Sequence, residues 1–304
     1  MKHLKRIFDL KLDFTFAKYA ELCRQILDSG YSILTVEKYL TTNKKPDKFA
    51  IIRHDIDDDA DLAYAIKMAR YEAELGIATT YYFRTCKSVF KIDRIKEIAR
   101  LGHEIGYHYE VLGEAEGDYE KAIGLFETEL NKFKDVYNIK TIAQHGGPLR
   151  SGLNVVSLSG ILGIFKHLVR QNDIFDHWAS KDLWKEYDFS KYGIIGEVYL
   201  SIDYSAVVYL SDTNRTWMDT SYRLKDHVEK KVGDGSEVII KDTDELIENV
   251  KNSNIQNFIV LVHPSNWRER FWEWLTWLIL QQVRNNGKRC LVAYWKRRKL
   301  VNRV

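Results

Sequence analysis

The sequence contains few cysteines and few prolines. Its three cysteines, Cys23, Cys86 and Cys290, are odd in number and far apart, which argues against a disulfide framework and favours a reducing compartment. Only three prolines occur in 304 residues, so no proline-rich linker separates domains. The formal net charge of +3 is too small to indicate a nucleic-acid partner.

Long apolar runs are also missing. The longest apolar-rich stretch covers residues 271–280 (FWEWLTWLIL), which is about half of a bilayer span, and it contains Glu273. The first residues, MKHLKRIFDLKLDF, carry charges that interrupt any signal-peptide core. We therefore expect a cytoplasmic protein.

Hydrophobic residues make up 45% and charged residues 29% of the chain, an ordinary globular balance. Short strand-like runs alternate with helical patterns, which predicts a parallel α/β fold of about seven βα units in a single domain, residues 1–304. Within this domain we expect an N-terminal helix at 13–28 and a C-terminal helix with a basic tail at 266–304. The strands are expected at 49–55, 78–85, 103–108, 141–147, 194–200, 205–212 and 257–264, and further helices at 59–76, 91–102, 116–133 and 242–253.

Polar residues stand at the ends of several of these strands. In a parallel barrel all strand carboxyl ends lie on one face, and that face carries the active site. The strand ends therefore predict one shared site, built from Asp55, Asp57, His108, His145 and His263.

The Asp55–Asp57 pair allows two interpretations. One carboxylate could bind a cation while the other stays free as a base, with Arg53 and His54 as supporting groups. Alternatively, the carboxylates simply cap the following helix.

Of the two histidines in GHEIGYH, His108 at the strand end suits a metal better than His103, which stands at the strand start and suits a structural role.

Further chain positions suggest a binding surface. His145 precedes two glycines, which allow a ligand to approach the backbone closely. His263 ends an apolar strand, where a polar residue is unexpected unless it has a function. The loop at 209–217 adds three candidate substrate-binding residues, with a plain surface turn as the alternative: Asp212 and Arg215 for a polar ligand, and Trp217 for stacking on a sugar ring.

The motifs RHDID, GHEIGYH, QHGGP, SDTNRTW and LVHP occur in this order between residues 49 and 267. In this combination the chain resembles the polysaccharide deacetylase (NodB-homology) superfamily, in particular its intracellular branch linked to surface-polysaccharide biosynthesis. The resemblance implies a distorted (β/α)7 TIM-like barrel that hydrolyses acyl groups on sugars with one divalent metal, commonly zinc.

The resemblance also implies a role for each site residue. Asp55 corresponds to the catalytic base, Asp57 and His108 to metal ligands, and His263 to the general acid. The family's second metal-binding histidine is replaced by Leu112, and His145 is the natural substitute. Mixed nitrogen and oxygen ligands suit zinc, and also iron, cobalt or manganese.

We therefore expect a metal-dependent hydrolase that removes an acyl group, N-acetyl first of all, from a sugar, sugar nucleotide or lipid-linked sugar of surface-glycan biosynthesis. Two alternatives stay open: a catalytically silent barrel that binds a glycan or a protein, and a hydrolase of a non-sugar C–N bond. Residues 284–304 contain eight basic and no acidic residues, which suits either a peripheral membrane contact or a solvated tail.

Overall fold

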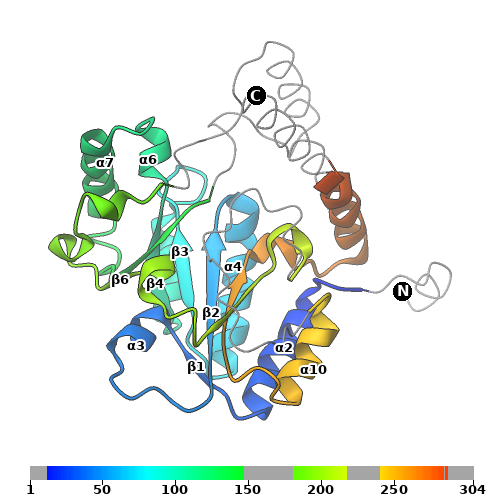
Figure 1. Ribbon diagram of the computed structural model, residues 1–304. Coiled ribbons are helices and arrows are strands. Elements are labelled where there is room, and N and C mark those ends of the chain that lie inside the picture. Colours follow the sequence, from blue (N-terminus) through cyan, green and yellow to red (C-terminus); the bar gives the residue numbers. More distant parts are fainter. Residues whose placement is uncertain (1–11, 147–180, 218–239, 284, 287–304) are drawn as a thin grey trace, which may run out of the picture.

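The protein folds around a sheet of parallel strands. The computed structural model describes residues 12–146, 181–217, 240–283 and 285–286 (Figure 1). The strands run in the order β6-β5-β4-β3-β2-β8-β7, and β1 pairs with the first half of β2. Their bounds are β1 Ser32–Leu34, β2 Phe49–Ile56, β3 Thr80–Phe83, β4 Glu104–Tyr109, β5 Thr141–Gln144, β6 Gly196–Glu197, β7 Val208–Ser211 and β8 Asn257–Val262.

The sheet is an open half-barrel in the part of the chain that the structure describes. Its two end strands are β6 and β7, and they do not pair with each other. The α/β class with parallel strands is thus confirmed, and the open sheet is compatible with the expected distorted (β/α)7 TIM-like barrel, although the described residues form only part of such a barrel. Tyr39, Phe49, Tyr82 and Ile259 are among the buried side chains that fill its concave side.

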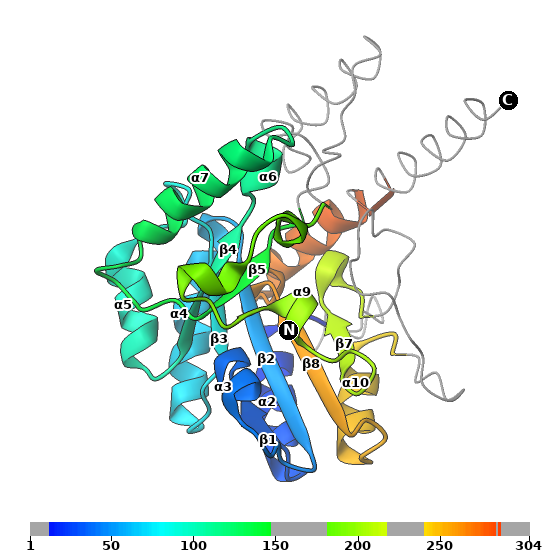
Figure 2. The same cartoon turned by 60° about the vertical axis from the view of Figure 1, so that its left-hand side comes forward.

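Helices follow most strands and pack on the outside of the sheet (Figure 2). The helix bounds are α2 Phe16–Asp28, α3 Val36–Thr41, α4 Asp59–Glu74, α5 Ile92–Arg100, α6 Val111–Glu114, α7 Tyr119–Asn131, α9 Val198–Ser201 and α10 Thr243–Lys251, with 3₁₀ turns η1 Leu183–Lys185, η2 Phe189–Tyr192, η3 Thr213–Arg215 and η5 Pro264–Asn266.

Helix α4 begins after Asp58, whose side chain accepts a hydrogen bond from the amide of Asp61. The capping residue therefore lies one position before the expected start of the helix at residue 59.

Three expected elements differ from the structure. The N-terminal helix starts at Phe16 rather than at Asp13, because Phe14 has a φ of 51° and Thr15 caps the helix. The expected strand at 194–200 is strand only over β6, since the Glu197 side chain accepts amide hydrogen bonds and starts α9. The C-terminal helix begins at residue 271, and its basic tail at 287–304 lies outside the described residues.

Strand β2 positions the site because its side chains alternate between the two faces of the sheet. Arg53 and Asp55 point into the barrel, where Arg53 lies over the rings of Tyr82 and Tyr199. His54, between them, points to the outer face and stacks on Tyr81. Strand β2 therefore places Arg53 and Asp55 on the inner face of the sheet, near the site, and His54 on the outer face.

Candidate metal-binding site

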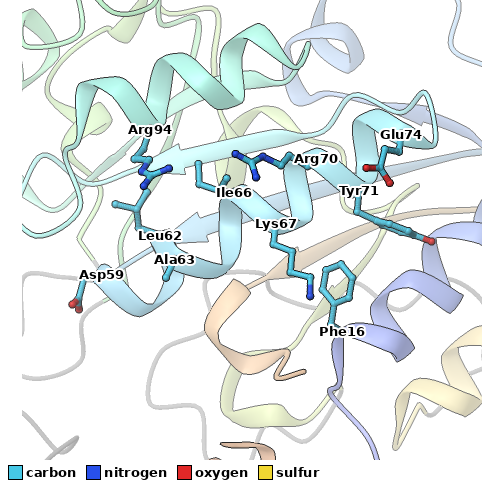
Figure 3. Close-up of a pocket in the computed structure, with 10 residues that line it drawn as sticks. All are labelled: Phe16, Asp59, Leu62, Ala63, Ile66, Lys67, Arg70, Tyr71, Glu74 and Arg94. Atoms are coloured by element: carbon cyan, nitrogen blue, oxygen red, sulfur yellow. The ribbon is translucent and has the colours of Figure 1, made fainter. Parts of the chain in front are cut away.

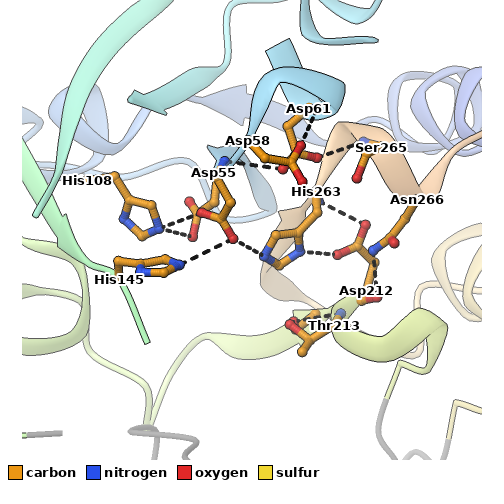
Figure 4. A network of polar contacts seen from close by, with 12 residues as sticks. Asp55, Asp58, Asp61, His108, His145, Asp212, Thr213, His263, Ser265 and Asn266 are labelled. Carbon is orange, nitrogen blue, oxygen red and sulfur yellow. Dashed lines mark hydrogen bonds and ion pairs between the residues drawn. The ribbon is translucent and has the colours of Figure 1, made fainter. Parts of the chain in front are cut away.

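Three side chains converge at the carboxyl ends of β2, β4 and β5. One donor atom each from Asp57, His108 and His145 can be chosen so that all lie within 4.8 Å of one another. Nε2 of His108 is 3.3 Å from Oδ1 of Asp57, and Nε2 of His145 is 3.5 Å from Oδ2 of the same carboxylate. Figure 4 shows His108 and His145 side by side, with His263 on the other side of the network. The structure thus brings together the three residues that the sequence predicts as metal ligands.

Both imidazoles are held by the nitrogen that faces away from Asp57. Nδ1 of His108 is 2.8 Å from the carbonyl oxygen of Ala143, so it donates a hydrogen bond there and Nε2 is the nitrogen that faces Asp57. Nδ1 of His145 is 3.1 Å from Oε1 of Glu110. Metal-binding histidines typically have such an oxygen partner on the second nitrogen, because it fixes the tautomer and the ring orientation.

Glu110 is a site residue that the sequence interpretation missed. Its second oxygen pairs with Arg84, which also donates a hydrogen bond from Nη1 to the backbone carbonyl of Asp57 at 3.2 Å. Arg84 therefore ties the loop that carries Asp57 to the carboxylate that holds His145. The sequence signal was present, since Glu110 stands two positions after His108 at the end of the same strand.

The donor set fits a divalent cation. Oδ1 of Asp57 is buried and has no hydrogen-bond partner among the described residues, although it faces Nε2 of His108. Burial raises the pKa of Asp57, but His145 and His108 outweigh this and hold it well below its ordinary value. Two imidazole nitrogens and one carboxylate leave a fourth position open, which is the pattern of catalytic zinc sites.

Asp55 lies beside this donor set. Its Oδ2 is 3.4 Å from Nε2 of His108. Arg53 donates two hydrogen bonds to it, from Nε to Oδ1 at 3.1 Å and from Nη2 to Oδ2 at 2.6 Å, and a third to the hydroxyl of Tyr199. Burial raises the pKa of Asp55, but Arg53 and His108 outweigh it and lower the pKa overall. Asp55 is therefore an ionised, firmly oriented carboxylate.

His263 completes the site from the end of β8. Its Nε2 is 3.7 Å from Oδ2 of Asp57, and its Nδ1 donates to Oδ1 of Asp212 at 2.7 Å. Oδ2 of Asp212 accepts from the amide of His263 at 2.9 Å and from Nε1 of Trp267 at 2.8 Å. Burial lowers the pKa of His263, but Asp212 outweighs it and raises the pKa to about 10. Asp212 thus orients an imidazole whose Nε2 faces the donor set.

Asp61, which has no role in the sequence interpretation, links the two sides of the site. One carboxylate oxygen accepts the amide of Asp57 at 3.2 Å and the other the amide of Ser265 at 2.8 Å. Burial, followed by the neighbouring Asp57 and Asp58 carboxylates, raises its pKa to about 7. Asp61 therefore holds the loop after β2 against the loop after β8.

The expected substrate-binding residues lie elsewhere. Trp217 is only 1% exposed, stacks on Phe14, and donates from Nε1 to Thr243, so it has no ring face available for a sugar. Arg215 is also buried and donates to the carbonyl oxygen of Asp13. Asp212 orients His263. Neither Arg215 nor Trp217 points toward the candidate site, because the loop folds inward against the N-terminal segment, so the substrate-binding interpretation of this loop stays a prediction without geometric support.

His54 does not support the carboxylate pair, contrary to expectation. Because it faces outward, its Nε2 contacts Oε1 of Glu72 at 2.7 Å in a fully buried cluster. The same carboxylate accepts hydrogen bonds from Thr79 and Tyr81, at 2.7 and 2.8 Å. His103 lies in this cluster too, with Nδ1 at 3.6 Å from Glu72, in agreement with its predicted structural role.

Leu112 faces the hydrophobic core rather than the site. It lies in α6, is 1% exposed, and belongs to the buried cluster that includes Val111 and Phe126. A histidine at this position would point into apolar surroundings in this fold. The third side chain of the donor set comes instead from His145, just after β5.

An open groove of about 820 Å³ runs along the outer side of α4. Its lining includes Leu62, Ile66, Lys67 and Arg70 of α4 and Phe16 of α2 (Figure 3). None of its lining residues belongs to the candidate site, and Lys67 is already paired with Glu269. The groove lies on the outer side of the helix layer, whereas the predicted chemistry lies at the strand ends.

Comparison with known proteins identifies no relative of this chain. The chain matches no family model, no curated protein and no solved structure. The function must therefore be inferred from the site itself and from the motifs that carry the resemblance.

Proposed function

We propose that the protein is a metal-dependent hydrolase of the polysaccharide deacetylase type, which removes an acyl group from a sugar-containing intermediate. The observation that carries the proposal is the arrangement of the three donors of Asp57, His108 and His145 between an ionised carboxylate, Asp55, and an oriented imidazole, His263. Acyl transfer to water needs these three components: an electrophilic centre, a base and an acid. The sugar as substrate rests on the resemblance of the motifs alone.

Asp57, His108 and His145 would hold the cation. When bound, a divalent cation polarises the acyl carbonyl and lowers the pKa of a water molecule. Asp55 accepts the proton of the attacking water. Its two hydrogen bonds from Arg53 keep the carboxylate in place while its charge changes, since Arg53 is always protonated.

His263 donates a proton to the leaving nitrogen or oxygen. Asp212 accepts from Nδ1–H and so keeps the proton to be transferred on Nε2, the nitrogen that faces the donor set. Trp267 and the backbone amide of His263 fix Asp212 in turn. The base and the acid therefore flank the donor set, as displacement of an amine or alcohol by water requires.

The competing interpretation is a silent barrel that has lost its metal along with the second family histidine. The position of His145 argues against it. Nε2 of His145 faces Asp57, and its Nδ1 is held by Glu110, as expected of a ligand. Leu112 therefore does not leave the donor set incomplete.

Metal analysis of the purified full chain tests the proposal. We expect about one equivalent of zinc or a related divalent ion, and loss of most of it in Asp57→Ala, His108→Ala and His145→Ala, because two remaining donors hold a cation weakly. Asp59→Ala is the matched control, since this exposed carboxylate stands two residues after Asp57, at the first position of α4. Full occupancy in His145→Ala would show that His145 is not a ligand.

Activity is tested separately with N-acetylated sugars and sugar nucleotides, by following acetate release. Release that depends on the metal and on Asp55 supports the deacetylase. Tight stoichiometric metal without acetate release from any of these substrates favours a hydrolase of another C–N bond. Absence of any bound metal supports the silent barrel.

A further inference from the structure

The two loops that carry Asp57 and His263 extend beyond the paired part of the sheet. The last residue pair between strands β2 and β8 is His54 opposite Val262. Asp57 and His263 both follow this pair, so the main-chain hydrogen bonds between the two strands do not fix the distance between them. Their side chains nevertheless approach each other, with Nε2 of His263 at 3.7 Å from Oδ2 of Asp57. A further contact is therefore needed to hold the two loops in this arrangement.

Asp61 makes such a contact from the first turn of α4. Its Oδ2 accepts a hydrogen bond from the amide of Asp57 at 3.2 Å, and its Oδ1 accepts one from the amide of Ser265 at 2.8 Å. Ser265 stands two residues after His263, in η5. Figure 4 shows Asp61 joined to Ser265 in the network that contains His263. One carboxylate therefore bridges the loop with the candidate ligand and the loop with the candidate acid.

Asp61 is itself held firmly in place. Its amide donates a hydrogen bond to Oδ1 of Asp58, the residue that caps α4, at 2.9 Å. The residue is only 3% exposed. Helix α4 continues to Glu74 and contacts both β2 and η5. Because the helix packs against both elements, its first turn is a rigid support for the bridging carboxylate.

The bridge requires two acceptor oxygens on one side chain. A carboxylate accepts at both oxygens, whereas the side-chain amide of asparagine has nearly the same shape but only one acceptor, next to a donating NH2 group. In Asp61→Asn one backbone N–H would keep its acceptor, and the other would face an NH2 group. Ser265 is buried, so water does not readily replace a lost acceptor there. Asparagine should therefore break the bridge although it fills the same space.

We propose that Asp61 is a positioning residue that joins the Asp57 loop to the His263 loop, so that cation binding and the placement of the acid depend on each other. The inference rests on the proposed function, since it takes Asp57 as a metal ligand. Asp61 acts through the backbone, because its two oxygens accept from the amides of Asp57 and Ser265. Such coupling is reciprocal: the factor by which the bridge strengthens cation binding is the factor by which a bound cation stabilises the bridged loop.

Zinc affinity of the full chain, measured at pH 8 by competition with a chelator of known affinity, is the first test. We expect Asp61→Asn and Asp61→Ala to bind zinc roughly 10–100-fold more weakly than the parent, the loss typical of a group that orients a metal ligand. If Asp61 only filled space, asparagine would replace it without loss of affinity, because the two side chains have nearly the same size.

Hydrogen exchange of the backbone amides in residues 263–267 is the second test, since it reports on the loop after β8 without any substrate. In the parent, zinc should slow this exchange by a factor similar to the loss of affinity in the variants, roughly 10–100-fold. In Asp61→Asn the exchange should be faster without zinc, and zinc should slow it much less. The amides of α7, which carries none of the site residues, should exchange alike in all of these proteins.

Asp58→Asn is the matched control. It removes a carboxylate from the start of the same helix, but asparagine caps a helix as well as aspartate does, so the hydrogen bond from the amide of Asp61 is kept. This variant should bind zinc and protect residues 263–267 as the parent does. Equal losses in Asp58→Asn and Asp61→Asn would assign the effect to the removed charge and overturn the bridge.

Two further results would overturn the coupling alone: zinc affinity of Asp61→Asn equal to that of the parent, or exchange in residues 263–267 of the parent that zinc does not change. If thermal unfolding shows that both Asp61 variants fail to fold, the exchange measurement on the parent decides by itself. Absence of any bound divalent cation in the parent contradicts the proposed function, and the coupling with it. Failure of the coupling is thus distinguished from failure of the proposed function by whether the parent binds metal.

Discussion

Glu110 holds His145 by the ring nitrogen that the donor set does not use. Oε1 of Glu110 lies 3.1 Å from Nδ1, while Nε2 lies 3.5 Å from Asp57. The carboxylate therefore lies on the side of the ring that faces away from the donor set and favours a proton on Nδ1. Arg84 pairs with the same carboxylate and donates a hydrogen bond to the backbone carbonyl of Asp57. Arg84 therefore contacts both the residue next to His145 and the loop that carries Asp57.

Loss of Glu110 should weaken the metal site without removing a ligand. We expect Glu110→Ala to lower metal affinity roughly 10–100-fold, because the imidazole loses the partner that orients it. Glu110→Gln should be milder, since its amide oxygen can still lie next to Nδ1, although without the negative charge. Competition with a chelator of known affinity measures this. The exposed Glu114→Ala is the control, and equal affinity of Glu110→Ala and the parent would contradict the role.

Asp55→Asn should separate chemistry from metal binding. The amide keeps the size of the side chain but cannot accept the proton, so turnover should fall roughly 10²–10⁴-fold while metal content is retained. The variant should also be less stable by about 3–5 kcal/mol, since the buried Arg53 loses its charge partner. Metal analysis, acetate release and urea unfolding at neutral pH measure the three effects. Near-normal turnover would remove Asp55 from the mechanism.

Leu112→His should not restore the ligand set of the resembled family. Position 112 is buried in an apolar cluster, so a histidine there should cost about 2–5 kcal/mol of stability. It should also fail to rescue metal binding when combined with His145→Ala. Leu112→Met, a volume-conserving exchange, is the control and should cost less than about 1.5 kcal/mol. Rescue of metal binding by the double variant would show that α6 can face the site.

Glu72 should make stability depend on pH in the acid range. Burial raises its pKa, but His54 and His103 outweigh it and lower the pKa to about 2 from the ordinary 4.5. The folded state therefore binds this proton less readily than the unfolded state. Roughly 3 kcal/mol of stability should be present above pH 4.5 and be lost as the pH falls toward 2.

Urea unfolding at several pH values between 7 and 3 measures this contribution. Glu72→Gln should be less stable at neutral pH and should lose less stability on acidification than the parent. Glu74→Gln, on the exposed side of the same helix, should follow the parent at every pH. Identical acid slopes for Glu72→Gln and the parent would refute the assignment.

Much of the site could be predicted from the sequence because the carboxyl ends of parallel strands lie on one face of the sheet. Asp57, His108 and His145 meet because parallel strands end on one face, and this needs only the strand positions and their direction. The open edge between β6 and β7 was not predictable, because local patterns define strands but not the pairs that close a barrel. Residues 1–11 and the basic tail lie outside the described part of the chain.

The failures have a common physical cause. His54 was grouped with its sequence neighbours, although alternation in a strand sends it to the other face. Trp217 was interpreted as an exposed loop residue, whereas the loop packs on Phe14. Glu110 was overlooked because its role depends on His145, which is distant in the chain but adjacent in space. In each case the deciding contact is long-range, and a local pattern does not contain it.

The pairing of β2 with β8 sets the order in which the site can be assembled during synthesis. Phe49 lies opposite Asn257, so this part of the sheet forms only after most of the chain has left the ribosome. The candidate ligands Asp57, His108 and His145 all precede that point, and His263 follows it. A growing chain thus carries the candidate ligands before it carries His263, and under the proposed mechanism hydrolysis would have to wait for β8.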